Sequence, residues 1–228
     1  MTIQILQFPI DPLEQGTGLD MEYRRRTVEG ILESYHTNFD VFSEGIQNAV
    51  DAVEDTKLAE LDAPYLIEIT VDLAKNWIGI LDTGIGMTPE EVTSAFAPHV
   101  SFKQQSAVKK KRDKKSMYRG YKGVGLTFLA YGTDDILIHS KQQNGSLTKA
   151  RMQYGRAWAK GELDKPALMV EDSGPSPLDP YPRGTYVQIQ FSQKTRPKSL
   201  SKLAPSIEIW KTILRTKTAI GQVLRSQT

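Results

Sequence analysis

Three polar side chains at helical spacing are the first residues of this sequence whose types could do chemistry together. Glu44, Asn48 and Asp51 lie in FSEGIQNAVDAVEDTKL, and at about 100° per residue they fall within about 60° on one face. An amide oxygen suits Mg²⁺, which takes oxygen ligands and keeps several waters. A glutamate one turn earlier is placed to accept a proton from a water that attacks a phosphate. The spacing indicates metal-assisted attack on a phosphate, although a solvated polar helix face has the same periodicity.

The elements that must position these side chains follow from hydrophobic periodicity. We expect helices over 22–35, 40–60, 89–96, 123–132 and 206–225, strands over 65–73, 76–82, 134–141, 147–155 and 185–192, and a loop over 194–206. Thr88 is the expected N-cap of the third helix and Pro89 its first residue. The pattern indicates an α+β fold: a two-layer α/β sandwich with a mixed, mostly antiparallel sheet and helices on one face.

The segment ILDTGIGM (80–87) places one carboxylate before two glycines. Asp82 could accept a hydrogen bond from a ligand, while Gly84 and Gly86 let the backbone bend and approach that ligand without a Cβ clash. Met87 could form a flexible apolar wall beside the ligand or belong to the core. Taken alone, this segment predicts only a turn.

A glycine-rich segment, RGYKGVGLTFLA (119–130), leads into the expected helix over 123–132. Backbone N–H groups around Gly120, Gly123 and Gly125 can turn toward phosphates at the start of a helix. Lys122 could contact a phosphate or be solvated. The segment has neither the P-loop pattern nor the dinucleotide-binding G-x-G-x-x-G pattern, so it predicts a phosphate cradle of another kind.

Composition excludes several other classes of protein. The 228 residues contain no cysteine, which excludes disulfides and thiolate metal sites, and the three histidines are too scattered for zinc-ligand spacing. No run of residues approaches the length of a transmembrane helix, and the N-terminus lacks the layout of a signal peptide. We expect a cytoplasmic protein that does not bind a membrane.

Most of the positive charge lies in one tract. Residues 103–122 hold nine Lys and Arg against one acid, while the rest of the chain carries 20 basic and 26 acidic residues. The polar tract 97–119 has no periodicity, which predicts a mobile loop. The basic residues could also contact DNA or RNA by displacing counterions, but aromatic residues for base stacking are few.

Four motifs in this order resemble those of the GHKL ATPases, which include gyrase, the ninety-kilodalton heat-shock chaperones, histidine kinases and MutL, with the microrchidia ATPases as close relatives. EGIQNAVDA (44–52) resembles the E-x-x-x-N-A-x-D helix, and DTGIGM (82–87) is similar to the adenine-binding D-x-G-x-G turn. RGYKGVGLTFLA looks like the segment after the ATP lid, and GTYVQIQF (184–191) resembles the strand that carries a Gly-Thr near the adenine. The segment HVSFKQQS (99–106), at the start of the expected lid, resembles the microrchidia and chaperone branches more than the kinases.

The resemblance implies a Bergerat fold and assigns roles residue by residue. Glu44 is the implied general base, Asn48 the implied Mg²⁺ ligand, and Asp82 the implied reader of the adenine amine. The tract 97–122 is the implied mobile ATP lid. The implied ATP-binding residues are Asn48, Asp51, Asp82, Gly84, Gly86, Met87, Lys103, Gly120, Tyr121, Lys122, Gly123, Val124, Gly125, Leu126 and Thr185.

The implied function is Mg²⁺-dependent ATP hydrolysis that drives a conformational switch or a clamp, with a homodimer formed when ATP is bound. Two alternatives stay open: a histidine-kinase-like phosphotransfer domain, and an ATP-sensing module that binds nucleic acid through the basic lid 103–122 without turnover. We expect an ATPase domain over 1–195. Residues 196–228 then form a linker and a C-terminal helix that caps the sheet or leads into a further domain.

Overall fold

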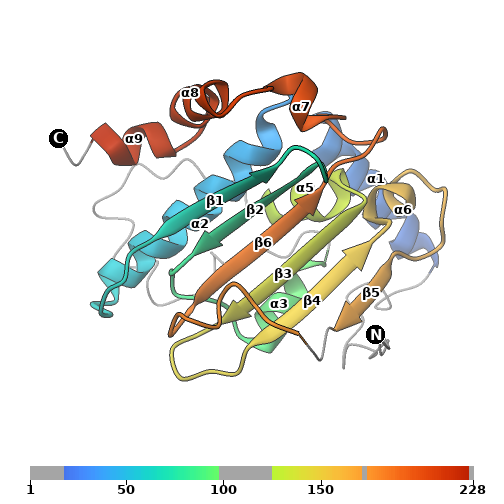
Figure 1. Cartoon of the computed structure of the whole chain (residues 1–228). Coiled ribbons are helices and arrows are strands. Elements are labelled where there is room, and N and C mark those ends of the chain that lie inside the picture. Colours follow the sequence, from blue (N-terminus) through green and yellow to red (C-terminus); the bar gives the residue numbers. More distant parts are fainter. Residues whose placement is uncertain (1–17, 98–124, 171–173, 226–228) are drawn as a thin grey trace.

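The computed structural model describes residues 18–97, 125–170 and 174–225 (Figure 1). Within these ranges no helix is both long and apolar enough to cross a bilayer. The described elements run in the order α1 (Gly18–Glu33), α2 (Asp40–Leu58), β1 (Ile67–Asp72), β2 (Trp77–Asp82), α3 (Pro89–Ala95), α5 (Gly125–Gly132), β3 (Asp135–Lys141), β4 (Thr148–Gln153), α6 (Gly155–Ala159), β5 (Ala167–Val170), β6 (Gly184–Gln190), α7 (Leu200–Leu203), α8 (Ile207–Lys217) and α9 (Ile220–Arg225).

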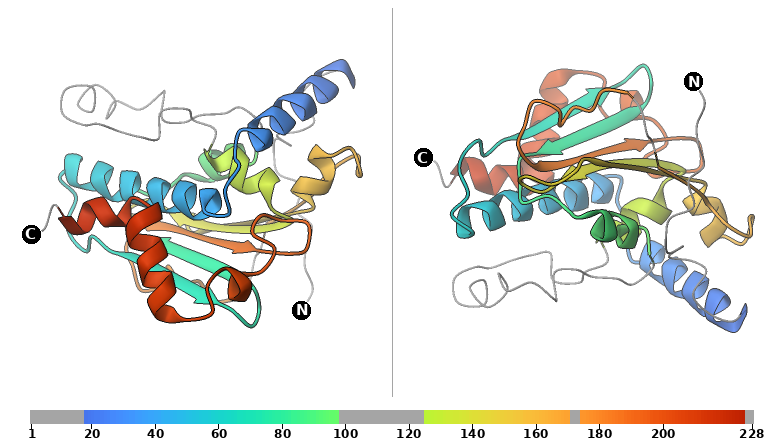
Figure 2. Two further views of the ribbon diagram at one scale, coloured as in Figure 1. Left: turned by 90° about the horizontal axis from the view of Figure 1, so that it is seen from above. Right: turned by 90° about the horizontal axis from the view of Figure 1, so that it is seen from below.

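Six strands form one sheet in the order β1-β2-β6-β3-β4-β5, and every pair of neighbours is antiparallel. Helices α2, α3 and α5 cover one face of this sheet, and α1 lies on the same side, packed against α5 and α6 (Figure 2). The expected α+β sandwich with helices on one face is confirmed. We expected a mixed, mostly antiparallel sheet, whereas all strand pairs in the described part of the chain are antiparallel.

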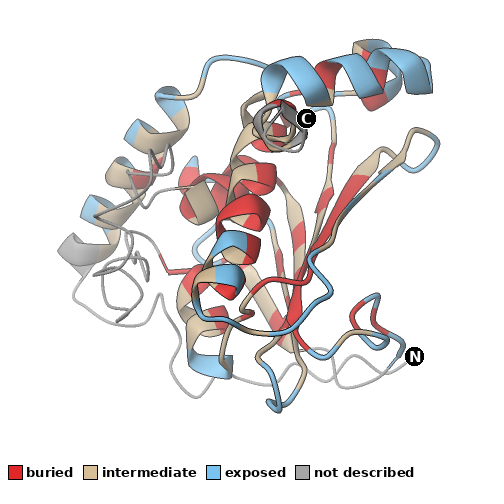
Figure 3. Ribbon diagram, turned by 90° about the vertical axis from the view of Figure 1, so that its left-hand side faces the viewer, coloured by how far each residue is buried: buried red, intermediate tan, exposed pale blue. Residues whose placement is uncertain are grey.

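The main core lies between the helices and the sheet. An apolar stripe on α2 is buried there, and it consists of Phe42, Ile46, Ala49, Val50 and Val53. Buried residues line the sides of α2 and the strands that face each other (Figure 3). Gly45 lets α2 approach the sheet closely, because a Cβ on this residue would lie 2.7 Å from Cδ1 of Ile80. The apolar stripe therefore fixes which side of α2 carries its polar residues.

Local signals in the sequence set the boundaries of two helices. Thr88 caps α3 through a capping box: its hydroxyl accepts a hydrogen bond from the N–H of Glu91, whose carboxylate accepts one from the N–H of Thr88. Pro89 follows at the start of the helix, as expected. Helix α5 ends at Gly132, the expected closing residue.

Three expectations about secondary structure were wrong. The strand expected over 147–155 ends at Gln153, because Tyr154 adopts a left-handed conformation (φ +65°) that starts the unexpected helix α6. The unexpected strand β5 follows, and the expected loop over 194–206 contains α7. The single helix expected over 206–225 is two helices, because Thr218 is extended between α8 and α9.

The C-terminal helices share the main core. The side chain of Trp210 on α8 is 4% exposed, meets the ring of Phe42 edge-on at 5.3 Å, and donates a hydrogen bond from Nε1 to the carbonyl of Ala204. Leu200 on α7 and Ile213 on α8 belong to the same cluster of buried side chains. Residues beyond 196 therefore pack directly on the first turn of α2.

We expect Trp210→Ala to lower the free energy of unfolding by about 3 to 5 kcal/mol, since truncating a buried aromatic side chain leaves a cavity. Ile207→Ala on the same helix is the matched control, because Ile207 is 68% exposed and its loss should change stability by less than about 0.5 kcal/mol. Denaturant titrations of both variants measure these values. Equal stabilities of the two variants would contradict a core shared with α8.

Candidate functional site

A row of residues crosses the sheet near the ends of its central strands. Strand register pairs Asp82 on β2 with Thr185 on β6, Thr185 with Ser140 on β3, and Ser140 with Thr148 on β4. Residues directly opposite each other in a sheet point to the same face. Asp82 and the core residue Ile80 are two positions apart in β2, so they point to the same face and the row lies on the face that the helices cover.

Asp82 is a buried carboxylate. It is 5% exposed, and burial raises its pKa to about 7, although backbone hydrogen bonds from Gly84 and Thr185 act to lower it. The N–H of Gly84 donates to Oδ1 at 2.8 Å. A ligand group that donates a hydrogen bond here would replace lost solvation and favour the charged form.

The turn after Asp82 is fastened to its surroundings. A Cβ on Gly84 would lie 2.5 Å from Cβ of Ala52 on α2, and the N–H of Ile85 donates to the carbonyl of Ala52 at 3.2 Å. Gly86 has a φ of +70°, and a Cβ there would lie 2.0 Å from the carbonyl oxygen of Lys141. Both glycines are therefore required by close approach of the backbone, one to α2 and one to the end of β3.

Thr83 ties the same turn to the loop before β1. Its buried hydroxyl donates to the carbonyl of Pro64 at 2.8 Å and accepts from the N–H of Leu66 at 2.8 Å. The N–H of Thr83 donates to the carbonyl of Leu66 at 3.0 Å. These bonds hold the backbone directly after Asp82 against the loop before β1.

Ser140 is a buried residue of the row that sequence reasoning missed. Its hydroxyl lies 2.9 Å from Oγ1 of Thr185, 3.0 Å from the carbonyl oxygen of Gly184 and 2.9 Å from the N–H of Met87. Met87 is half-buried and packs beside the main core. No spacing in the sequence marks Ser140, because its position depends on how β3 pairs with β6.

The polar face of α2 meets the start of α5. A Cβ on Gly125 would lie 2.4 Å from Oε2 of Glu44 and 3.6 Å from Nδ2 of Asn48. The first residue of α5 therefore lies directly against these two side chains, and a larger residue would require the Glu44 carboxylate to move. Leu126, the next residue, is half-buried against the core. The structure thus brings together Glu44, Asn48 and Gly125 as the sequence indicated.

Tyr35 is a second residue that the sequence did not reveal. Its phenol hydrogen-bonds Glu44, and burial together with that carboxylate raises the pKa of Tyr35 well above its usual value. Its ring stacks on Phe128 of α5, with centroids 3.7 Å apart. Tyr35 therefore connects Glu44 to α5.

Asp51, the third polar residue expected on α2, is buried and bonded within the helix. It is 2% exposed, and its Oδ1 accepts a hydrogen bond from Nε2 of Gln47 at 2.7 Å. The described residues contain no group of three or more His, Cys, Asp or Glu side chains that could hold a metal ion. An ion held by Asn48 at the polar face of α2 would therefore need further ligands from a bound molecule and water.

Several of the expected site residues lie outside the described residues. These are Lys103, Gly120, Tyr121, Lys122, Gly123 and Val124, together with the expected lid over 97–122 beyond Ala97. Their roles stay predictions.

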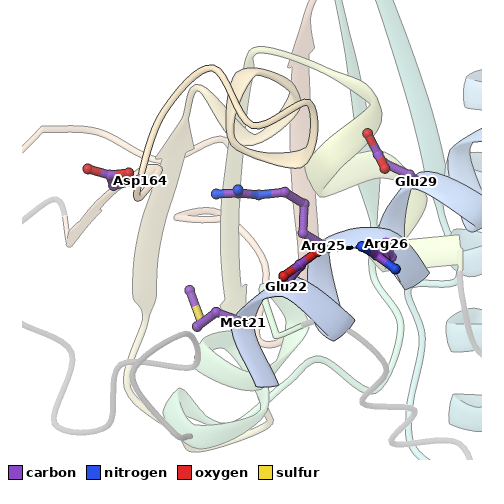
Figure 4. Close-up of a pocket in the computed structure, with 6 residues that line it drawn as sticks. All are labelled: Met21, Glu22, Arg25, Arg26, Glu29 and Asp164. Atoms are coloured by element: carbon purple, nitrogen blue, oxygen red, sulfur yellow. Dashed lines mark hydrogen bonds and ion pairs between the residues drawn. The ribbon is translucent and has the colours of Figure 1, made fainter. Parts of the chain in front are cut away.

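A cavity of about 580 Å³ lies elsewhere, between α1 and the loop that joins α6 to β5 (Figure 4). It is lined by Met21, Glu22, Arg25, Arg26, Glu29 and Asp164. Glu22 and Arg26 pair with each other, while Arg25 donates to the carbonyl of Leu163. The cavity shares no residue with the row of Asp82 or with the polar face of α2, so it is separate from the candidate site.

A helix-covered antiparallel sheet with a buried aspartate at the end of one strand, and a polar helix face beside it, matches the Bergerat fold of nucleotide-binding ATPase domains. The family model described as "Histidine kinase-, DNA gyrase B-, and HSP90-like ATPase" matches residues 35–185. The chain belongs to this family.

Chaperones are among the curated relatives. The chain is 27% identical over 197 residues to "Heat shock protein 90-6, mitochondrial" of Arabidopsis thaliana. This alignment covers 78% of this chain and 23% of the relative. It is 30% identical over 157 residues to "Chaperone protein HtpG" of Bacillus licheniformis. This second alignment covers 63% of this chain and 24% of that protein. The alignments thus span about a quarter of the length of these relatives.

Asp82 makes the free energy of unfolding depend on pH. Its pKa of about 7 lies above the ordinary value of 3.8, so the folded state binds this proton more tightly. Its contribution to stability is present below the ordinary pKa and is lost as the pH rises to about 7, by at most about 1.4 kcal/mol per pH unit.

We expect Asp82→Asn to lack this component in denaturant titrations at a series of pH values between about 4 and 8. The difference in stability between the variant and the unmodified protein should therefore change with pH in that window and stay constant above it. A constant difference across the whole range would contradict burial of an ionisable carboxylate.

Proposed function

We propose that this domain binds ATP with Mg²⁺ and hydrolyses it. The observation that carries the proposal is that one helix serves both ends of the site. Glu44 and Asn48 on α2 lie at the start of α5, while Ala52, further along the same helix, contacts Gly84 beside Asp82. From Glu44 to Ala52 the helix rises about 12 Å. That length suits a nucleotide whose base lies at Asp82 and whose terminal phosphate lies at Glu44.

At the base end, Asp82 accepts a hydrogen bond from the exocyclic amine of adenine. The buried carboxylate fits this role, because a bound amine supplies the donor that burial has removed. Thr185 supports the same edge of the base from the neighbouring strand. Met87, held through its N–H by Ser140, forms an apolar wall.

At the phosphate end, the backbone at Gly125 and the preceding glycine-rich segment bind the phosphates. The Asn48 amide oxygen would hold Mg²⁺, which would offset phosphate charge. The close approach of Gly125 to Asn48 and Glu44 supports this placement. Asp51 is buried beside Gln47 and orients the polar face of α2.

Glu44 is the general base of hydrolysis. A water attacks the terminal phosphorus, the bond to the oxygen of the β-phosphate breaks, and the proton of the water passes to the carboxylate. The hydrogen bond from Tyr35 fixes the direction of that carboxylate.

Hydrolysis serves a conformational switch in which two copies of the chain associate when ATP is bound. The relatives named as heat shock protein and HtpG chaperones support this part of the proposal over the histidine-kinase-like alternative. ATP sensing without turnover, with nucleic acid bound through residues 103–122, is the other alternative, and the two experiments below separate it from hydrolysis.

We expect Glu44→Ala to bind ATP but to hydrolyse it about 10²- to 10⁴-fold more slowly, because it lacks the proton acceptor. Glu54→Ala is the matched control, since Glu54 is exposed on the same helix. Phosphate release at saturating ATP measures turnover, and calorimetry measures binding. Equal turnover in the two variants would remove the role of Glu44.

We expect a non-hydrolysable ATP analogue with Mg²⁺ to bind the unmodified protein and to double its mass in solution. Asp82→Asn should bind the analogue about 10- to 150-fold more weakly, because a hydrogen bond to a charged acceptor is lost. Calorimetry and light scattering supply the two readouts. Absence of binding would contradict the nucleotide site, whereas binding without a change in mass would contradict association alone.

A further inference from the structure

The hydroxyl of Ser140 has three hydrogen-bond partners and no exposure to solvent. The N–H of Met87 lies at 2.9 Å, the carbonyl oxygen of Gly184 at 3.0 Å, and Oγ1 of Thr185 at 2.9 Å. A serine hydroxyl carries one hydrogen and can accept two hydrogen bonds. The three contacts therefore use its full capacity.

The chemistry of the partners fixes the direction of each bond. A backbone N–H can only donate, so Met87 takes one acceptor position of Ser140. A carbonyl oxygen can only accept, so Gly184 takes the single hydrogen of Ser140. The remaining bond must run from the hydroxyl of Thr185 to the second acceptor position of Ser140.

This direction decides what Thr185 can offer to a ligand. Its only side-chain hydrogen points toward Ser140, so its oxygen faces other groups solely as an acceptor. Ionised Asp82, its partner in the sheet register, is also solely an acceptor. Because both side chains accept hydrogen bonds, they favour a ligand edge that donates hydrogen bonds. They disfavour an edge that places an acceptor oxygen at the same position.

We propose that Ser140 is a positioning residue that makes this site select 6-aminopurine nucleotides over 6-oxopurine nucleotides, by holding Thr185 as an acceptor. The proposal rests on the nucleotide site proposed above and adds a determinant of its specificity. The exocyclic amine of a 6-aminopurine donates to the pair formed by Asp82 and Thr185. The O6 atom of a 6-oxopurine would face two acceptors at the same place.

Inosine triphosphate is the probe, because it carries an oxygen at position 6 where ATP carries the amine. Binding is measured by calorimetry with Mg²⁺ at about pH 8, where Asp82 is ionised. We expect the unmodified protein to bind ATP about 10- to 150-fold more tightly than inosine triphosphate, the range for losing one hydrogen bond to a charged group. Equal affinities would overturn the proposal and leave ATP binding intact, whereas no binding of either nucleotide would overturn the proposed function itself.

Ser140→Ala frees the hydrogen of Thr185, which can then donate to O6. We expect the preference for ATP to fall at least about fivefold, mainly through tighter binding of inosine triphosphate. Ser140→Thr keeps the hydroxyl and should keep the preference. Thr148→Val is the matched control, because Thr148 is the next residue of the same row on β4. An unchanged preference in Ser140→Ala would overturn the proposal.

A double-mutant cycle separates positioning from a general effect on folding. Because Ser140 acts through the hydroxyl of Thr185, Ser140→Ala should leave the preference unchanged in a Thr185→Val background. The same loss of preference in both backgrounds would show that Ser140 acts by another route and would overturn the proposal. If Ser140→Ala fails to fold, Ser140→Cys, with its weaker donor and acceptor, takes its place, and retention of the full preference in that variant would count against the proposal.

Discussion

The close contact between Ala52 on α2 and Gly84 after β2 is the constraint on which the rest of the site depends. A methyl group on Gly84 would lie 2.5 Å from that of Ala52, so helix and turn can meet only through glycine. This contact sets how far α2 stands from the sheet at the buried end of the site. Because a helix is rigid over a few turns, it also sets where Glu44 and Asn48 meet α5. One approach of two backbones thereby positions groups at both ends of the site.

Motifs and periodicity predicted the residues whose places depend on their own segment. The polar face of α2, the turn after Asp82 and the cap at Thr88 are of this kind. Ser140 and Tyr35 could not be found in this way, because one depends on the register of β3 with β6 and the other on stacking with Phe128. Helix α6 and strand β5 were not predicted for another reason: with five and four residues, they are too short to show a hydrophobic period. Continuous apolar spacing also hid the break at Thr218, which permits Gly221 to lie against the carbonyl of Arg215.

The donor and acceptor roles of neighbouring hydroxyl groups on β3 and β6 are fixed one by the other. Backbone groups at Met87 and Gly184 cannot change between donor and acceptor, so they fix the hydroxyl of Ser140, which in turn fixes that of Thr185. Asp82 is also buried, and its backbone partners at Gly84 and Thr185 are donors only. Above about pH 7, where Asp82 is ionised, these side chains therefore present a defined pattern of acceptors without a ligand.

The place of β6 in the sheet has a consequence for how the protein is made. This strand is the last of the described strands along the chain, yet it lies between β2 and β3 and is the only described strand that joins them. Before it emerges, the sheet consists of two separate pieces, β1–β2 and β3–β4–β5. Asp82 belongs to the first piece and Ser140 to the second, while Thr185 arrives on β6 itself. A chain still in synthesis thus lacks the assembled row of Asp82, Thr185 and Ser140, which forms only when β6 joins the two pieces of the sheet.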